Sequence, residues 1–356
     1  MLNVVQVKNK VKIFLAVLFG MMLFVQIPVS AQIIQRGESV PQDSTVPASY
    51  HQHAIEFETS DGVKLVGYVL GSGDKGVTLG HASGWTLKSM VPFANELVAR
   101  GYKVIMWDYR NNAPSDIIPA SDPKSYRIDN DVLAAVDVLR GEGVNQFFML
   151  GASIGGTSTT VAASQTKGLV GLGILSSPRT FGGGVVNAID AIRKISVPSF
   201  FAVSTHDFSG NYYAEVKALY DSSPARDKVF KTIDSGEHGF DMLLAPDKYL
   251  EGIERETPYQ FTKDSAPLSK MNQDLLDFID HSFGKVENAG SSDASSTESS
   301  SATKNVTSSS KNQVSSSQTE KSSHSQIPKM LLLAGIVVIV AAILIAVRIL
   351  FFTKRK

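Results

Sequence analysis

A serine stands at the centre of the stretch whose residue types and spacing best suit covalent chemistry. The stretch reads Gly151-Ala152-Ser153-Ile154-Gly155, a G-x-S-x-G pattern. An apolar run ending at Leu150 predicts a buried strand before it, and small residues from Thr157 to Ala163 suit a helix after it. A sharp, strained turn of this kind exposes the serine Oγ, and side chains at the two glycines would collide with the neighbouring strand and helix. Ser153 is therefore the candidate nucleophile.

Strands and helices are predicted to alternate from Ala54 to Phe283, the part of the chain that must position this serine. The first two strands flank Ser60-Asp61-Gly62, which is a hairpin signal. The predicted strands are 54–59, 63–70, 77–79, 103–107, 147–150, 170–175, 199–203 and 228–233. The predicted helices are 87–100, 128–139, 185–195, 212–220 and 268–283. This alternation predicts an α/β fold with a mostly parallel sheet covered on both faces, whose reacting groups gather at the C-terminal ends of the strands.

Three residues with suitable chemistry follow predicted strands. They are Ser153, Asp207 and His238, and their order along the chain is the order of the α/β-hydrolase triad. From Ala54 to Phe283 the chain resembles the α/β-hydrolase superfamily. Many lipases insert a helical lid between two of their strands, where this chain has only the residues from Ser176 to Ile195. The chain is therefore more similar to small esterases, dienelactone-hydrolase-like enzymes and peptidase-like members.

Two further stretches carry this resemblance, and both depart from the family pattern. Leu79-Gly80-His81-Ala82 stands where the family has an apolar strand that ends in His-Gly. Asp108 to Ser115 resembles the loop Asp-x-Arg-Gly-x-Gly-x-Ser, with Asn111 and Ala113 in place of its glycines. His81 is expected to shape the loop that follows it. The replaced glycines bear on the shape of both loops.

The resemblance implies a serine hydrolase with an acyl-enzyme intermediate. His238 would be the general base and Asp207 would hold its ring. The oxyanion would be bound by the backbone N–H of Ile154 and by one from Ala82 or Ser83. No metal ion or organic cofactor is implied. The alternatives that the residues leave open are His206 for the base, and Asp234 or Asp241 for the carboxylate.

Charge and composition exclude several other classes of protein. Formal net charge is zero, but residues 1–31 and 327–356 contain eight of the 34 basic residues and no acidic ones. The segment between them has 26 basic against 34 acidic groups, a net charge of −8, which argues against nucleic-acid binding. The absence of cysteine excludes disulfides, thiolate metal sites and a cysteine nucleophile, and in an exported protein it fits a bacterial source.

The two ends of the sequence predict an exported, membrane-anchored protein. Basic residues, the apolar run from Ile13 to Val25 and Val29-Ser30-Ala31 are typical of a signal peptide, with an uncleaved anchor as the alternative. A serine-rich stalk and an apolar run from Met330 to Phe352 indicate a tether. The predicted parts are a signal peptide (1–31), a polar lead-in (32–53), the hydrolase domain (54–286), a serine-rich linker (287–327), a transmembrane helix (328–353) and a basic cytoplasmic tail (354–356).

Two functions follow from the sequence. The first is a hydrolase held at the outer face of a bacterial cell membrane, which cleaves carboxylic esters, or amides as a second choice, in the wall or medium. The second is a hydrolase-fold binding or display module without catalysis, which the altered glycines would allow. The sequence specifies neither the acyl group nor the oligomeric state.

Overall fold

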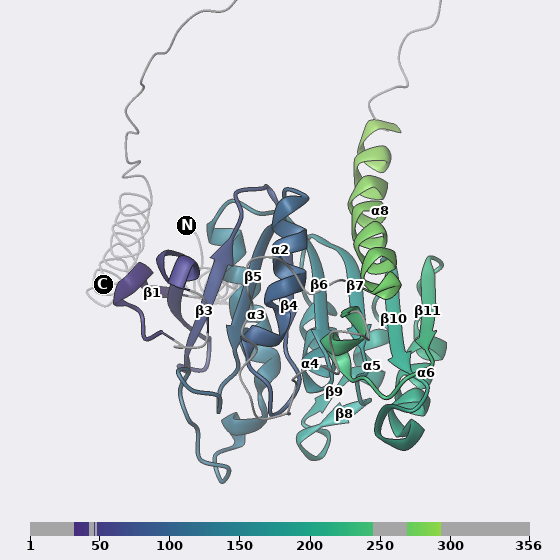
Figure 1. Ribbon diagram of the computed structural model, residues 1–356, viewed down its shortest axis with the longest axis horizontal. Coiled ribbons are helices and arrows are strands. Elements are labelled where there is room, and N and C mark those ends of the chain that lie inside the picture. The colour runs from purple at the N-terminus through teal and green to yellow at the C-terminus, as the bar shows by residue number, and fades with distance from the viewer. Residues whose placement is uncertain (1–31, 43–45, 47, 245–268, 293–356) are drawn as a thin grey trace, which may run out of the picture. The chain divides into compact units, whose positions relative to one another are not determined.

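The central element of the fold is a twisted nine-stranded sheet (Figure 1). The computed structural model describes residues 32–42, 46, 48–244 and 269–292, so the predicted signal peptide, stalk and transmembrane helix lie outside the described residues. None of the helices within the described ranges is both long and apolar enough to cross a membrane.

Six neighbouring strands of the sheet run parallel. The order across the sheet is β1-β2-β3-β5-β4-β6-β7-β10-β11, with antiparallel pairs from β1 to β5 and parallel pairs from β5 to β11. The strands are β1 (Gln32–Arg36), β2 (Ala54–Glu58), β3 (Lys64–Leu70), β4 (Lys75–Gly80), β5 (Lys103–Asp108), β6 (Gln146–Ala152), β7 (Leu169–Leu175), β10 (Ser199–Ser204) and β11 (Lys228–Ile233). The predicted, mostly parallel sheet is confirmed.

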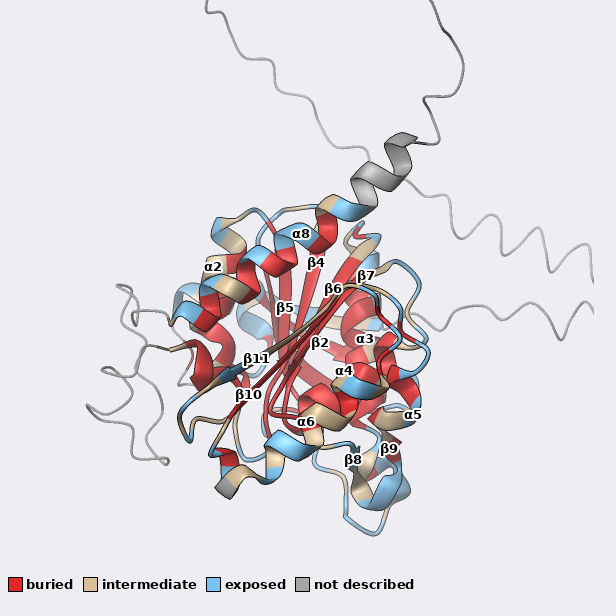
Figure 2. Cartoon of the chain, turned by 90° about the vertical axis from the view of Figure 1, so that its right-hand side faces the viewer, coloured by how far each residue is buried: buried red, intermediate tan, exposed pale blue. Residues whose placement is uncertain are grey.

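Helices cover both faces of the sheet, as Figure 2 shows by the buried residues that they turn toward it. Successive side chains of a strand point to opposite faces, so Phe148 and Leu150 of β6 join one apolar core while Phe147 and Met149 join the other. The first core is closed by α2 (Val91–Ala99) and α8 (Lys270–Ser292). The second is closed by α3 (Ile128–Gly141), α4 (Ile154–Ala163), α5 (Ala188–Ile192) and α6 (Asn211–Ser222).

The folded unit begins earlier than the sequence predicts. Residues 32–53 are not a lead-in outside the domain, because β1 pairs antiparallel with β2 and places Ile33 opposite Phe57. Val40 and Val46 are buried in the first core. Polar residues dominate β1 because it is an edge strand that is largely exposed, and this composition conceals it in the sequence. The last helix also continues to Ser292, beyond the predicted boundary at 286.

The segment between β7 and β10 is short and carries no helical lid. The helix predicted over 185–195 is shorter: β9 (Val186–Asn187) pairs with β8 (Thr180–Phe181) in a short hairpin, and α5 (Ala188–Ile192) follows. Asn187 Oδ1 accepts the N–H of Asp190, so Asn187 caps the helix and delays its start.

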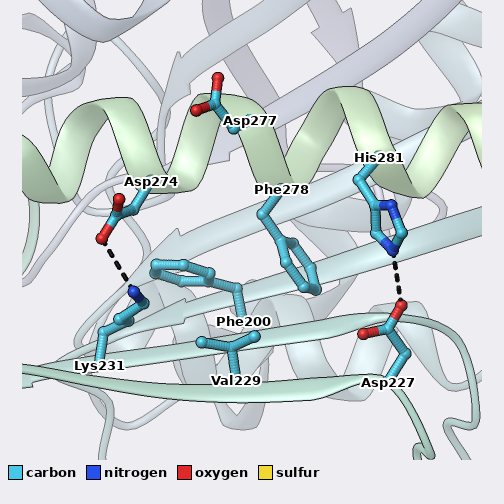
Figure 3. A pocket seen from close by; sticks show the side chains of 8 residues that line it. All are labelled: Phe200, Asp227, Val229, Lys231, Asp274, Asp277, Phe278 and His281. Carbon is cyan, nitrogen blue, oxygen red and sulfur yellow. Dashed lines mark hydrogen bonds and ion pairs between the residues drawn. The ribbon is translucent and has the colours of Figure 1, made fainter.

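Helix α8 packs on β10 through an aromatic contact between Phe278 and Phe200, whose ring centroids lie 5.4 Å apart. Figure 3 shows this contact between two ion pairs, Lys231–Asp274 and His281–Asp227. A pocket of about 370 Å³ opens here. None of the residues that line it is a predicted site residue, so we assign it no part in catalysis.

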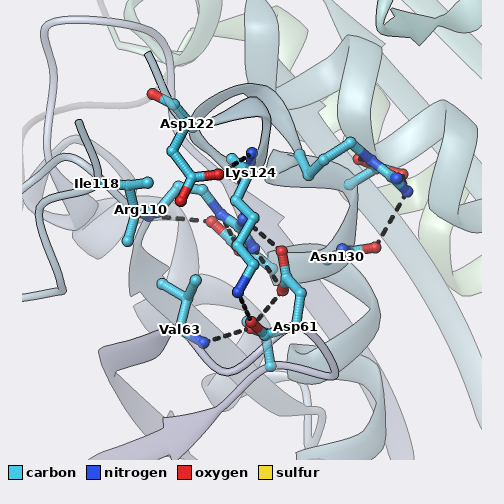
Figure 4. Close-up of polar contacts among 12 residues, drawn as sticks. Asp61, Val63, Arg110, Ile118, Asp122, Lys124 and Asn130 are labelled. Carbon is cyan, nitrogen blue, oxygen red and sulfur yellow. Dashed lines mark hydrogen bonds and ion pairs between the residues drawn. The ribbon is translucent and has the colours of Figure 1, made fainter. Parts of the chain in front are cut away.

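The buried side chain of Arg110 anchors the loop that follows β5. Arg110 pairs with Asp131 of α3 and with Asp61 at the tip of the β2–β3 hairpin, where the Nη1–Oδ2 distance is 2.7 Å (Figure 4). Partial burial alone would raise the pKa of Asp61, but the hydrogen bonds and charge of Arg110 lower it to about 2. The arginine therefore ties the hairpin and α3 to the loop.

Asn111 adopts the conformation that a glycine would supply at its position in this loop. Its φ is +71°, a left-handed value that asparagine tolerates better than most other side chains. The side chain accepts the N–H of Ile118 at 2.7 Å and donates to the carbonyl of Ser125 at 3.2 Å. Asn111 thus supplies the left-handed turn that a glycine would allow, and it adds hydrogen bonds across the loop.

Candidate active site

Ser153 occupies a strained turn between β6 and α4, as its sequence context predicts. Its φ of +53° and ψ of −126° lie outside the regions that residues with a Cβ normally adopt, and only 3% of the residue is exposed. Strain of this kind persists where the surrounding structure enforces it, and it clusters at functional sites. The Ser153 N–H donates to Leu175 O of the neighbouring β7 at 2.8 Å, which fixes the turn to the sheet.

The two glycines of the pattern leave no room for side chains. A Cβ on Gly151 would lie 2.5 Å from the carbonyl oxygen of Gly155. A Cβ on Gly155 would lie 2.7 Å from the carbonyl oxygen of Gly80 and would also clash with that of His81. Glycine is therefore required at both positions, because α4 starts in direct contact with the end of β4.

His238 and Asp207 form a largely buried pair at the same edge of the sheet. His238 Nδ1 lies 2.9 Å from both carboxylate oxygens of Asp207, whose side chain is fully buried. A carboxylate can only accept, so in the neutral ring Nδ1 donates the proton and Nε2 keeps its lone pair. This is the tautomer that a histidine base requires.

Contacts between neighbouring residues place the histidine loop beside the serine turn. A Cβ on Gly239 would lie only 2.9 Å from the Cβ of Ala152, so the residue after His238 lies against the residue before Ser153. The Gly239 N–H also donates to Ser176 Oγ at 3.1 Å, at the end of β7. The serine turn follows β6 and the histidine–aspartate pair follows β10 and β11, so all three residues lie at the C-terminal ends of parallel strands, with β7 between the serine and the pair. The chain has the α/β-hydrolase fold.

Comparison with known proteins finds distant solved structures only. No protein-family model and no curated protein matches the chain. A Pyrococcus furiosus esterase is similar at 18% identity and a TM-score of 0.46, over 57% of this chain and 90% of the esterase. An Exiguobacterium antarcticum esterase is similar at 15% identity and a TM-score of 0.45, over 63% of this chain and 98% of its own. We assign the α/β-hydrolase fold from the strand order and the turn at Ser153.

The predicted oxyanion donors lie on two segments of this hydrolase fold that touch each other. Ile154 is the first residue of α4, so its N–H has no acceptor within the helix. The loop with Ala82 and Ser83 follows β4, whose last residues contact Gly155 at the start of α4. The assignment of these N–H groups to an oxyanion site stays a prediction, and their nearness is consistent with it.

His81 is fully buried and holds the loop that contains Ala82 and Ser83. Its Nδ1 donates to Ala82 O at 2.8 Å, and its Nε2 accepts the Tyr109 N–H at 3.2 Å. Both bonds require the neutral ring, and burial lowers the pKa of His81 to about 4. The carbonyl of Ala82 therefore points toward the His81 ring. The N–H of Ser83 belongs to the same trans peptide, whose C=O and N–H point in opposite directions, so this N–H points away from the ring.

The pKa of His81 predicts a pH dependence of stability. Between about pH 6.5 and 4 the unfolded chain protonates this histidine and the folded chain does not, so the free energy of unfolding falls as the pH falls, by about 3 kcal/mol for this group. We expect His81→Asn, which can keep a donor toward Ala82, to remove this part of the pH dependence. Urea unfolding at pH 7.0 and 4.5 measures it. Equal pH slopes in the two proteins would contradict the assignment.

The structure places Asp207, and not one of the alternative carboxylates, against Nδ1 of His238. His206 Nε2 lies 3.1 Å from Asp234 Oδ1, and these exposed side chains pair with each other. Asp241 follows His238 in the short helix η7 (Gly239–Leu243), and its N–H donates to His238 O at 3.2 Å. Asp207 is the carboxylate that contacts Nδ1 of His238.

Two buried serines that sequence analysis did not single out hold the backbone on both sides of His238. Ser204 Oγ donates to Glu237 O at 2.6 Å, just before the histidine. Ser176 Oγ accepts the N–H of Gly239, just after it. Ser204 is the last residue of β10, and Ser176 directly follows β7. One indication of these two serines is present in the sequence, which is that each lies at the end of a predicted strand.

Among the described residues, no group of three or more His, Asp or Glu side chains is arranged to hold a metal ion. The expectation that no metal or cofactor takes part stays a prediction.

Proposed function

We propose that this protein is a serine hydrolase that cleaves carboxylic esters through Ser153, His238 and Asp207. The observation that carries the proposal is the buried His238–Asp207 pair beside the strained turn at Ser153. A strained, glycine-flanked serine has little structural use in itself, whereas a nucleophile benefits from this geometry. The distant likeness to esterases is consistent with the proposal and does not carry it.

In the proposed mechanism His238 Nε2 takes the Ser153 proton as Oγ bonds to the carbonyl carbon of the ester. The π electrons of the carbonyl move to its oxygen, which accepts hydrogen bonds from the N–H of Ile154 and from one in the Ala82–Ser83 loop. Collapse of this intermediate breaks the bond to the alcohol, which leaves with the proton from His238. Water then attacks the acyl-enzyme by the same steps, and Asp207 stabilises the imidazolium each time.

A fluorophosphonate probe tests the whole arrangement, because labelling needs a hydroxyl that the probe can reach, a base and an oxyanion site together. We expect the wild-type protein to take up close to one equivalent of probe on the peptide that contains Ser153. Labelling should be absent in Ser153→Ala and His238→Ala. A folded wild-type protein that takes no label and cleaves no short-chain ester would favour the binding-module alternative.

We further propose that the hydrolase domain is tethered at the outer face of a bacterial membrane. Support comes from the sequence alone, in the apolar run from Met330 to Phe352 with Lys354-Arg355-Lys356 after it, since basic residues favour the cytoplasmic side. Protease added to intact cells should release a soluble domain and leave a C-terminal tag protected. Digestion of the tag while the domain survives would reverse the proposed orientation.

A further inference from the structure

We propose that Phe208 forms a subsite for the leaving alcohol, and that the preferred substrates are esters of apolar alcohols, aromatic ones above all. This inference rests on the proposed function and adds a substrate class to it.

Phe208 combines two properties that are costly for a phenylalanine. It is 56% exposed although its side chain is wholly apolar, and its φ is +42°, in the left-handed region that bulky residues avoid. It directly follows Asp207 in the short helix η6 (Asp207–Gly210). Strained residues cluster where the conformation has a use. Here the strained backbone places an exposed aromatic ring beside the proposed base.

The Phe208 ring is in contact with His238. The two ring centroids lie 5.2 Å apart, edge to face at 87°, and Tyr212 of α6 contacts both rings at 4.7 and 5.3 Å. Asp207 occupies Nδ1, so Nε2 must deliver the proton to the leaving oxygen from roughly 2.6–3.2 Å. The first carbons attached to that oxygen then lie within a few ångströms of the histidine ring, at the distance where Phe208 is found.

Strand order decides which half of the ester lies near Phe208. The loop with Ala82 and Ser83, which is proposed to bind the oxyanion, follows β4. Ser153 follows β6, and Phe208 follows β10, on the far side of β7 (Figure 1). The carbonyl oxygen of the substrate is drawn toward the β4 side of the serine. Phe208 lies on the opposite side, with the histidine that protonates the alcohol. The ring is thus placed to contact the alcohol and not the carbonyl oxygen.

The chemistry of the subsite favours an apolar alcohol. A ring that is already partly exposed gains stability when an aromatic or alkyl group covers it, and such pairs prefer the offset or edge-to-face packing that these side chains already show. When two substrates differ by one apolar group that a site can contact, the ratio of their kcat/KM values changes by about tenfold or more. A small alcohol such as methanol would be too short to gain this contact.

The test compares two series of esters in wild type, Phe208→Ala, Phe208→Leu and Ile117→Ala. One series varies the alcohol, with methyl and benzyl acetate. The other varies the acyl group, with ethyl acetate and ethyl hexanoate. We expect Phe208→Ala to lower the benzyl-to-methyl ratio of kcat/KM by about tenfold. The hexanoate-to-acetate ratio should not change, and Phe208→Leu should have an intermediate effect. Ile117 is 65% exposed and is the matched control for loss of an exposed apolar side chain.

Fluorophosphonate labelling separates failure of this inference from failure of the proposed function. The probe expels fluoride and not an alcohol, so Phe208→Ala should be labelled at the wild-type rate. Absence of labelling and of ester cleavage in the wild type overturns the proposed function itself. With an active wild type, the subsite is refuted if all alcohols lose activity equally in Phe208→Ala, or if the acyl ratio shifts instead.

Discussion

Ser153→Ala should lower kcat for ester hydrolysis by about a millionfold, the size of effect seen when the nucleophile of a serine-protease triad is removed. The variant loses the atom that bonds to the substrate, whereas the backbone strain at φ +53° is unchanged because alanine also has a Cβ. Stability to urea should therefore stay close to that of the wild type. Steady-state turnover of a short-chain ester measures the effect.

Ser164→Ala is the matched control for this variant. Ser164 ends the same helix, where its hydroxyl donates to Val161 O at 2.7 Å, so its loss should leave turnover unchanged. If Ser153→Ala retained most of the activity, another residue would have to be the nucleophile.

Asp207→Asn should lower kcat by about ten-thousandfold with the fold intact. The amide can donate a proton to Nδ1, which favours the tautomer with the proton on Nε2, and that nitrogen can then no longer accept the Ser153 proton. The amide also cannot stabilise the imidazolium as a carboxylate does. Circular dichroism and urea unfolding establish that the variant is folded, and turnover gives the loss.

The exposed pair His206–Asp234 supplies the controls for the histidine and the carboxylate. Asp234→Asn and His206→Ala remove partners that face solvent, so both variants should keep turnover within a few-fold of wild type. A greater loss in Asp234→Asn than in Asp207→Asn would mean that the catalytic carboxylate has been misassigned.

Much of the fold could be predicted because its central strands are buried on both faces. The apolar run that ends at Leu150 and the helix-period segment in α3 are strong signals, and these elements were predicted within about two residues. The edge strand β1 was missed because polar residues dominate its exposed surface. The helix predicted over 185–195 starts too early, because β9 and the cap at Asn187 delay the start of α5 to Ala188.

The candidate site could be predicted as a set of residues but not as a set of contacts. Ser153, Asp207 and His238 could be predicted because each follows a predicted strand, and parallel strands bring their C-terminal ends together. Sequence order could not decide between Asp207 and Asp234, because both follow strands and only packing separates a buried carboxylate from an exposed one. Phe208 carried no pattern at all. Its exposure and left-handed backbone exist only in the folded chain.

The hydrogen bonds of Asn111 affect which amino-acid substitutions this loop can accept during evolution. A glycine at this position could be replaced by asparagine at little cost, because both residues tolerate a φ of +71°. Once Asn111 bonds to Ile118 and Ser125, a return to glycine removes those hydrogen bonds and leaves their backbone partners to find others. The substitution is therefore easier to acquire than to reverse. With those hydrogen bonds in place, glycine is no longer the better residue at position 111.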